Sequence, residues 1–246
     1  IANSRKGDRT MTIKLYELLG DEERRYSQFS WRVKMALKHK GLAFEQIPIL
    51  LTDKESIAFA DANSVPVMVD GDTIKTDSWD IAVYLDDSYP DAPSLLGGTI
   101  GEGVTRVINS WCDRAVNVAL GPLIARDVLD AAHTDDRDYF RESMEKMYKR
   151  TLEDVQEGRE DRVINLYRTL DPIRTSFRKG QDFICGASPA YADYVVFSQF
   201  QWARVTSPFQ LLGAEDPVYA WRERMLDHFD GFARDTVCYE VFGREA

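Results

Sequence analysis

Residues 63–78 read NSVPVMVDGDTIKTDS, and this stretch decides the fold of the first part of the chain. Pro66 stands at the entrance of a short apolar run, a position in a strand where its missing N–H is tolerated. The Asp-Gly that follows is a hairpin signal, so the chain is expected to turn into a second strand over residues 73–75. Asp77 and Ser78 then open a segment with helical spacing. The stretch therefore predicts a strand, a hairpin, a second strand and the start of a helix.

The residues on either side of this stretch complete a small α/β layer. Alternating apolar and polar residues predict a strand over residues 13–18, and helical spacing predicts a helix over residues 28–40 that Gly41 ends. A strand, a helix, a strand, a hairpin and a helix within about 80 residues indicate an α/β domain, which we place at residues 11–89. The other expected elements are strands at 44–50 and 66–69, a short helix at 54–60 and a helix at 78–87.

The second part of the chain is predicted to be all-helical. Pro and Gly are frequent around residues 90–100, which we interpret as a linker. Hydrophobic residues occupy nearly every face of residues 191–205, which is typical of a helix in the middle of a domain. The all-helical domain is expected to cover residues 101–246, whereas residues 1–10, which are polar and precede Met11, are interpreted as a tail or a remnant of expression. Helices are expected at 101–130, 135–157, 160–178, 190–206 and 217–227.

The composition excludes several classes of protein. A formal charge of −10 over 246 residues repels phosphate, so neither nucleic acid nor an anionic membrane is an expected partner. No apolar run approaches the roughly 20 residues of a membrane span. Cys112, Cys185 and Cys238 are widely spaced and the three histidines are scattered, which predicts neither a disulfide framework nor a metal site. The sequence thus indicates a cytoplasmic, metal-free protein with reduced thiols.

Two short motifs in the first domain have both a structural and a ligand-binding interpretation. If the Val65-Pro66 bond is cis, the backbone N–H and C=O of Val65 turn outward and can pair with an extended peptide. Because only about 5–6% of X-Pro bonds in folded proteins are cis, the dipeptide alone favours an ordinary trans proline. Asp77 and Ser78 can simply cap a helix, or they can hold a ligand, with Ser78 and backbone amides binding a carboxylate and Asp77 binding an ammonium.

Ser27 precedes the first predicted helix and is a plausible N-cap. A hydroxyl at that position can also donate a hydrogen bond to a thiolate and favour the ionised form. A free thiol has a pKa of about 8.5, so it is mostly protonated at neutral pH without such help. Capping and thiolate binding are compatible roles for one side chain.

The order of these features resembles the glutathione transferase family. The first domain resembles its thioredoxin-like glutathione domain, and the helical second half resembles its all-α C-terminal domain, over nearly the whole of residues 11–246. Residues 30–41, SWRVKMALKHKG, look like the first helix of the bacterial glutathione-dependent lignin β-etherases. Residues 152–162, LEDVQEGREDR, are similar to a stretch in the same proteins. The resemblance therefore favours the etherase-related branch, to which the fungal A class belongs.

The resemblance assigns roles to individual residues. Ser27 matches the catalytic serine, and Val65, with Pro66 in the cis form, would pair with the cysteinyl unit of glutathione. Asp77 and Ser78 would hold the γ-glutamyl end. No motif fixes the residue that binds the glycyl carboxylate; the candidates are Lys40 and Lys54. Gln28 stands where the family often has proline, which leaves the hydroxyl of Ser27 but alters the loop before the helix.

A second departure from the family concerns folding. Relatives usually carry Ser, Thr or Asn three residues before the aspartate that corresponds to Asp193, and this chain has Ala190 there. The loss of such an N-cap costs about 1 kcal/mol. Ser188, or Asp193 bonding back to the backbone, is expected to compensate.

The pocket for a second, hydrophobic substrate is harder to locate from sequence. Five residues are candidates for its lining, although core packing is the commoner role for each: Tyr26, Trp111, Asn117, Tyr167 and Trp202. Arg204 is a sixth. Tyr16 and Tyr26 are also rival hydroxyls for the thiolate, and Tyr16 ranks second to Ser27 because it lies on the first strand, as in tyrosine-type transferases.

Two functions are compatible with these features. The first is an enzyme in which glutathione, as co-substrate, attacks hydrophobic aromatic electrophiles such as β-aryl ethers or other wood-derived phenolics. The second is a carrier (ligandin) that binds hydrophobic aromatic compounds with little catalysis. No cysteine precedes Cys112, so thiol-exchange chemistry at the first helix is not expected. The resemblance also implies a homodimer.

Overall fold

The computed structural model describes residues 12–239, so the predicted tail at residues 1–10 lies outside the described residues. Its first half contains a mixed sheet in the order β2-β1-β3-β4. β1 pairs with β2 in parallel and with β3 antiparallel, and β3 and β4 form the hairpin predicted at Asp70-Gly71-Asp72. The strands are β1 (Ile13–Leu18), β2 (Phe44–Ile49), β3 (Val67–Asp70) and β4 (Thr73–Lys75). All four predicted strands are therefore confirmed within one residue at each end.

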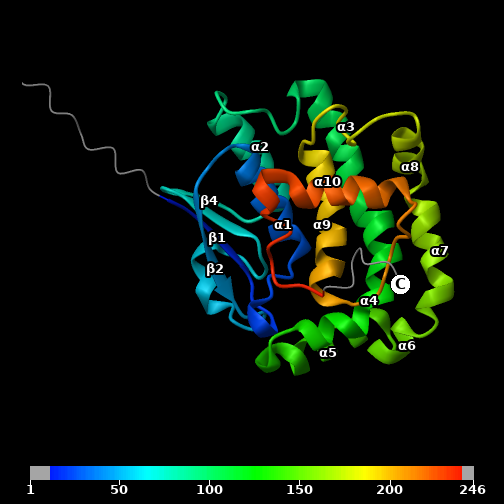
Figure 1. Ribbon diagram of the computed structural model, residues 1–246. Helices are drawn as coiled ribbons and strands as arrows, with labels where there is room; N and C mark the ends of the chain where they lie inside the picture. Colours follow the sequence, from blue (N-terminus) through cyan, green and yellow to red (C-terminus); the bar gives the residue numbers. More distant parts are fainter. Residues whose placement is uncertain (1–11, 240–246) are drawn as a thin grey trace, which may run out of the picture.

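Two helices of this half lie between the sheet and the helical half of the molecule (Figure 1). α1 (Gln28–His39) contacts α2 (Ser78–Ser88) and packs along α9 (Tyr191–Thr206). Gly41 follows α1 with φ +67°, a left-handed conformation that glycine adopts without strain, which explains why the helix stops there. The segment predicted as a short helix at 54–60 is a 3₁₀ turn over Glu55–Ala60. The first half thus places the N-terminus of α1 at the boundary between the two halves.

The second half is helical, as predicted, but with more breaks than the pattern indicated. α3 starts at Gly98, inside the predicted linker, and a π-helical turn at Cys112–Val116 separates it from α4. Lys149 adopts a left-handed conformation and Thr151 caps the next helix, so the predicted helix 135–157 is two helices. The predicted helix 160–178 divides at Leu170. The elements are α3 (Gly98–Trp111), α4 (Asn117–Ala131), α5 (Arg137–Tyr148), α6 (Leu152–Gln156), α7 (Arg159–Thr169), α8 (Asp171–Arg178), α9 and α10 (Pro217–Gly231).

α9 is almost entirely buried, which confirms the prediction of a central helix. No side chain caps it at Ala190, and the carboxylate of Asp193 accepts a hydrogen bond from the backbone N–H of Ala190 at 3.3 Å instead. The same carboxylate accepts from the backbone of Ile184 and Cys185 and from the indole of Trp221. Asp193 therefore bonds back to the backbone at the start of α9, as expected. Between residues 12 and 239 no helix has both the length and the apolar character to cross a membrane.

Candidate functional site

Ser27 is the N-cap of α1, and its side chain lies at the boundary between the two halves. Its Oγ accepts a hydrogen bond from the backbone N–H of Ser30 at 3.2 Å, so its own proton remains available for donation to a ligand. The side chain is nearly buried, at 8% exposure. The N-terminus of α1 adds a positive partial charge at the same point. Ser27 therefore combines a hydroxyl donor with a field that favours an anion.

A buried cluster of charged residues contacts the loop before Ser27. Lys34 lies 2.7 Å from Glu17, with both side chains 1% exposed, and Arg25 lies 3.5 Å from the same carboxylate. Burial lowers the pKa of Lys34, and the negative charge of Glu17 opposes that shift. The indole of Trp31 donates a hydrogen bond to the carbonyl of Arg25 at 2.7 Å. These contacts tie the residues just before Ser27 to β1 and α1.

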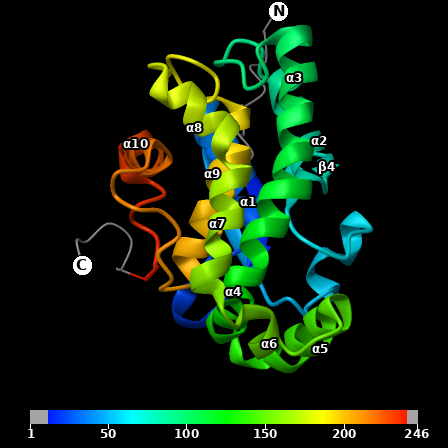
Figure 2. The ribbon, with the colours of Figure 1, turned by 90° about the vertical axis from the view of Figure 1, so that its right-hand side faces the viewer.

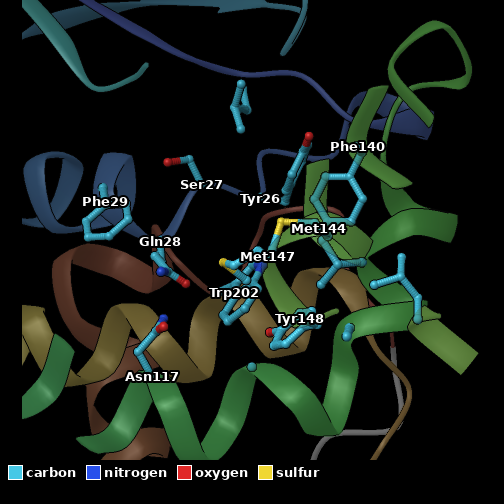
Figure 3. A pocket seen from close by; sticks show the side chains of 15 residues that line it. Tyr26, Ser27, Gln28, Phe29, Asn117, Phe140, Met144, Met147, Tyr148 and Trp202 are labelled. Atoms are coloured by element: carbon cyan, nitrogen blue, oxygen red, sulfur yellow. The ribbon is translucent and has the colours of Figure 1, made fainter. Parts of the chain in front are cut away.

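Two cavities meet at Ser27. The first, which we call the small cavity, has a volume of about 160 Å³ and lies on the side of the sheet. The second, the large cavity, has a volume of about 380 Å³ and lies between α1 and the helices of the second half (Figure 3). Leu18, Ser27 and Phe29 line both of them. A reacting atom beside the Ser27 hydroxyl can therefore be reached from either cavity.

The small cavity brings together three of the residues singled out in the sequence. Ser27, Lys54 and Val65 line it, and the Val65-Pro66 peptide bond is cis, as the resemblance implied. Partial burial lowers the pKa of Lys54, and the carboxylate of Asp136 opposes that shift. The lining of the small cavity thus includes a cationic residue as well as the serine. The other lining residues are Leu18, Phe29, Ile49, Leu50, Leu51, Ile57 and Ser64.

Asp77 and Ser78 lie at the start of α2, outside the small cavity. Asp77 caps the helix by accepting hydrogen bonds from the backbone N–H groups of Trp79 at 2.9 Å and Asp80 at 3.2 Å. The backbone carbonyl of Ser78 accepts from the hydroxyl of Tyr191 at 2.6 Å. The capping interpretation is confirmed for Asp77. Asp77 also lines a third cavity of about 450 Å³.

Lys40 borders a different cavity and is ion-paired, so the structure does not bring this candidate for the glycyl carboxylate to Ser27. Its ammonium lies 2.7 Å from the carboxylate of Asp86 and 3.1 Å from the carbonyl of Tyr89. The Lys40 side chain is 1% exposed, and the cavity that Lys40 borders contains Asp86 but neither Ser27 nor Val65. Its position after α1 in sequence gave no indication of this ion pair.

The large cavity contains some of the residues expected in an acceptor pocket. In Figure 3, Tyr26 and Ser27 lie on one side of it, Asn117, Trp202 and Tyr148 on the other. The amide of Asn117 donates a hydrogen bond to Gln199 at 3.0 Å. The large cavity is lined by Leu18, Tyr26, Ser27, Gln28, Phe29, Asn117, Gly121, Ala125, Val128, Phe140, Met144, Met147, Tyr148, Leu152 and Trp202.

Trp111 and Tyr167 do not line the large cavity, so the structure does not bring these two acceptor-pocket candidates to Ser27. Trp111 packs against the main hydrophobic core at the end of α3. Tyr167 also packs there, with the guanidinium of Arg174 5.9 Å from its ring. Arg204 donates its hydrogen bonds to backbone carbonyls near residue 233 and does not line the cavity either. For all three, core packing or internal bonding is the role that the structure supports.

Of the two rival hydroxyls, Tyr26 lines one of the cavities at Ser27 and Tyr16 lines neither. Tyr16 packs its ring against Phe59, with centroids 5.4 Å apart, and lines neither cavity. Tyr26 lines the large cavity, but burial raises the pKa of its phenol, and the nearby charge of Asp136 raises it further. Among the described residues its hydroxyl has no hydrogen-bond partner. Tyr26 therefore places a protonated phenol on the wall of the large cavity and is the second candidate donor.

The sequence interpretation missed the wall contributed by α5. Phe140, Met144 and Met147 follow one another at helical spacing and line the large cavity with Tyr148. Their spacing is the available signal, since it indicates one apolar face on that helix. The same pattern is typical of a helix that covers a core, so spacing alone does not distinguish a cavity wall. Gly121 on α4 was also missed, because a glycine has no side chain that would mark it in the sequence as part of a cavity wall.

Comparisons with known proteins agree with this architecture. The model of the glutathione S-transferase N-terminal domain matches residues 23–93, and the model of the C-terminal domain matches residues 104–216, so together they match most of the chain. Glutathione S-transferase Z2 of Arabidopsis thaliana is 43% identical over 74 residues, which is 28% of this chain and 33% of that protein. The chain thus spans about a third of the length of the curated relatives that it matches.

Solved structures share the fold over nearly the whole chain. Glutathione transferase GSTFuA2 from Phanerochaete chrysosporium has a TM-score of 0.73 at 23% identity, covering 90% of this chain and 94% of that one. A glutathione S-transferase of Ceriporiopsis subvermispora, solved in complex with glutathione, has a TM-score of 0.71 at 20% identity, covering 91% and 94%. At these identities the likeness concerns the fold. With both of its domain models matched in order along one chain, this protein belongs to the glutathione S-transferase family.

Proposed function

We propose that this protein is a glutathione transferase of the serine type, in which Ser27 stabilises the glutathione thiolate. The observation that carries the proposal is the position of Ser27, which lines both the small and the large cavity. A thiol placed beside its hydroxyl can be held from one cavity and can attack a molecule bound in the other. Family membership supports glutathione as the ligand.

In this proposal glutathione lies extended across the first half. An extended tripeptide spans about 10 Å, and Lys54 and Val65 line the small cavity while Asp77 lies at the start of α2. Lys54 would bind the glycyl carboxylate, and the backbone of Val65 would pair with the cysteinyl unit. The γ-glutamyl carboxylate would meet Ser78 and the N-terminal amides of α2, with Asp77 facing its ammonium.

The reaction that follows is a nucleophilic attack by sulfur. The hydroxyl of Ser27 donates a hydrogen bond to the thiolate, and the α1 N-terminus adds a favourable field, so more of the thiol is ionised at neutral pH. A carbon–sulfur bond forms at an electrophilic carbon, and the leaving group departs with its electron pair. With a β-aryl ether the leaving group is a phenolate.

We propose hydrophobic aromatic electrophiles as the second substrate. The large cavity supports this class, because Trp202, Phe140 and Met144 offer apolar and aromatic contacts beside Ser27. The choice of β-aryl ethers or other wood-derived phenolics rests on the similarity of residues 30–41 and 152–162 to the etherase-related branch.

The test is Ser27→Ala, measured with several aromatic electrophiles and with glutathione titrations. We expect turnover to fall on the order of 100-fold, with glutathione affinity nearly unchanged. Unchanged turnover would remove Ser27 from the mechanism. A wild-type protein that binds aromatic compounds at micromolar concentration but conjugates none of them would be a carrier instead.

We also propose that two copies of the chain associate through α3. Ile100, Val104 and Val107 are 85%, 59% and 66% exposed and lie on one face of this helix, which extends along the molecular surface (Figure 2). Ile74 on β4 is also exposed. Apolar stripes of this kind are unusual on monomers. Sedimentation should give a dimer for the wild type and a monomer for Val104→Glu; a monomeric wild type would contradict the proposal.

We further propose a cytoplasmic location, which the odd number and wide spacing of the cysteines in the sequence support. Fractionation of the source cells tests it, and recovery of the protein outside the cytoplasmic fraction would contradict it.

A further inference from the structure

Asp136 is a buried carboxylate whose bonds reach from the second half of the molecule into the first. It is the last residue before α5, and it is fully buried. Its oxygens accept hydrogen bonds from the backbone N–H of Leu51 at 2.7 Å and of Thr52 at 2.9 Å. The hydroxyl of Thr52 donates a third, at 2.7 Å. A buried carboxylate with three donors is a strong local tie, because each bond is assisted by its charge.

The segment that Asp136 holds is one wall of the small cavity. Leu51 lines that cavity, and Lys54 follows two residues after Thr52. The charge of Asp136 also acts on Lys54 directly, since it opposes the lowering of the pKa of the Lys54 ammonium by burial. Tyr139, three residues beyond Asp136, lies with its ring 5.9 Å from the same ammonium. Asp136 thus fixes both the backbone and the electrostatic surroundings of Lys54.

The helix that starts after Asp136 is one wall of the large cavity. Phe140, Met144 and Tyr148 extend from α5 toward the cavity, as Figure 3 shows. α5 packs these three side chains against a small buried cluster from α4 and α6, and Asp136 ties the start of the helix to the first half. Tyr26, next to Ser27, also feels the charge of Asp136. One carboxylate therefore lies between the wall of the small cavity, the wall of the large cavity and the residue beside Ser27.

A purely structural tie between the halves exists nearby and provides a comparison. Asp21 accepts a hydrogen bond from the backbone N–H of Thr134 at 3.1 Å and forms an ion pair with Arg137 at 2.5 Å. It anchors the start of α5 to the first half, as Asp136 does, but it lines neither cavity and bonds no residue of the 51–54 segment. If anchoring α5 were the whole role of Asp136, the two aspartates would be equivalent.

We propose that Asp136 is a positioning residue that couples the two cavities, so that glutathione in the small cavity strengthens binding of an apolar ligand in the large one. The inference rests on the proposed function, since it takes glutathione as the ligand of the small cavity. A ligand carboxylate that binds Lys54 orders the 51–54 segment, and the three bonds to Asp136 transmit that order to the start of α5. By thermodynamic linkage the apolar ligand then strengthens glutathione binding by the same factor.

The experiment measures this coupling with the fluorescent probe 8-anilinonaphthalene-1-sulfonate as the apolar ligand. Its dissociation constant is determined with and without saturating glutathione, and that of glutathione is determined with and without the probe. We expect a factor of about five in both directions for the wild type. For Asp136→Ala we expect a factor near one and glutathione binding weakened about tenfold, since two backbone N–H groups lose their acceptor.

Two further variants separate coupling from folding. Thr52→Val removes one of the three bonds and keeps both backbone donors, so it should reduce the coupling factor by about half without unfolding the protein. Asp21→Ala is the matched control and should leave the factor at its wild-type value. A wild-type factor near one, or an equal loss in Asp21→Ala and Asp136→Ala, overturns the proposal. Absence of any glutathione binding to the wild type would contradict the proposed function itself, before the coupling is measured.

Discussion

The small and large cavities share Ser27, yet the chain builds them in different ways. Much of the small cavity comes from backbone that local sequence fixes, such as the cap at Ser27 and the turn into β3 at Pro66. The large cavity is formed by side chains from α1, α4, α5 and α9, which lie far apart in sequence. The contrast implies that substitutions in the large cavity change which molecule reacts, whereas substitutions in the small cavity change how well glutathione is held.

The largest expected effect that separates the cavities is at Gly121. A Cβ placed there would lie 3.4 Å from the hydroxyl of Tyr148 and 3.7 Å from the ring of Trp202. Gly121→Val therefore extends two methyl groups into the large cavity. We expect kcat/KM for bulky aromatic electrophiles to fall on the order of 10–100-fold, with the glutathione KM unchanged.

Gly103 on α3 provides the matched control for this change. It is also a helical glycine, and a Cβ there meets nothing within 4 Å. Gly103→Val carries the same cost of a β-branched residue in a helix but leaves both cavities intact. Because Gly103 lies on the α3 face proposed to contact a second copy, sedimentation is measured alongside, and activity per subunit should stay at the wild-type level when the oligomeric state is unchanged. An equal loss in both variants would show that the helix, and not the cavity, limits activity.

The same contrast explains what the sequence could predict. The caps at Ser27 and Asp77 and the hairpin after β3 depend on residues that are neighbours in sequence. Local sequence patterns were therefore sufficient to predict them. Trp111 and Tyr167 were assigned to the acceptor pocket on residue type alone, and the position of such a side chain depends on contacts with distant segments. Met144 was missed because an apolar helix face looks the same whether it covers a core or a cavity.

Lys40 and Lys54 could not be distinguished from sequence as candidates for binding the glycyl carboxylate, but they lie at different cavities. Lys54→Met removes the cationic residue that lines the small cavity, so the glutathione KM should rise about tenfold, the value of one charge-assisted bond. Turnover at saturating glutathione should change little, because Lys54 does not touch the thiol in the proposed arrangement. Steady-state kinetics at several glutathione concentrations measure both quantities.

Lys40→Met should lower stability and leave the glutathione KM unchanged. It leaves Asp86 without the ammonium that lies 2.7 Å away, so the free energy of unfolding should fall by about 2 kcal/mol. The glutathione KM should not change, since Lys40 borders a different cavity. If Lys40→Met raised the glutathione KM as much as Lys54→Met, the separation of the two lysines by position would be contradicted.

The smallest expected effect is at Met144, and it tests how loosely the large cavity is specified. Met144→Leu nearly conserves volume, and such swaps usually cost less than about 1.5 kcal/mol. Met144 packs on one side against a small buried cluster and on the other borders the large cavity, so a leucine there has open space into which it can readjust. We therefore expect kcat/KM to change less than about threefold for any one electrophile, but in different directions for electrophiles of different shape.

A panel of aromatic electrophiles at saturating glutathione measures these changes in kcat/KM. Met147→Leu, at a neighbour that is 59% exposed, is the control that should change least. A uniform loss across the panel, or a change in the glutathione KM, would mean that α5 supports the small cavity as much as the large one, and the two cavities would then have to be treated as a single site.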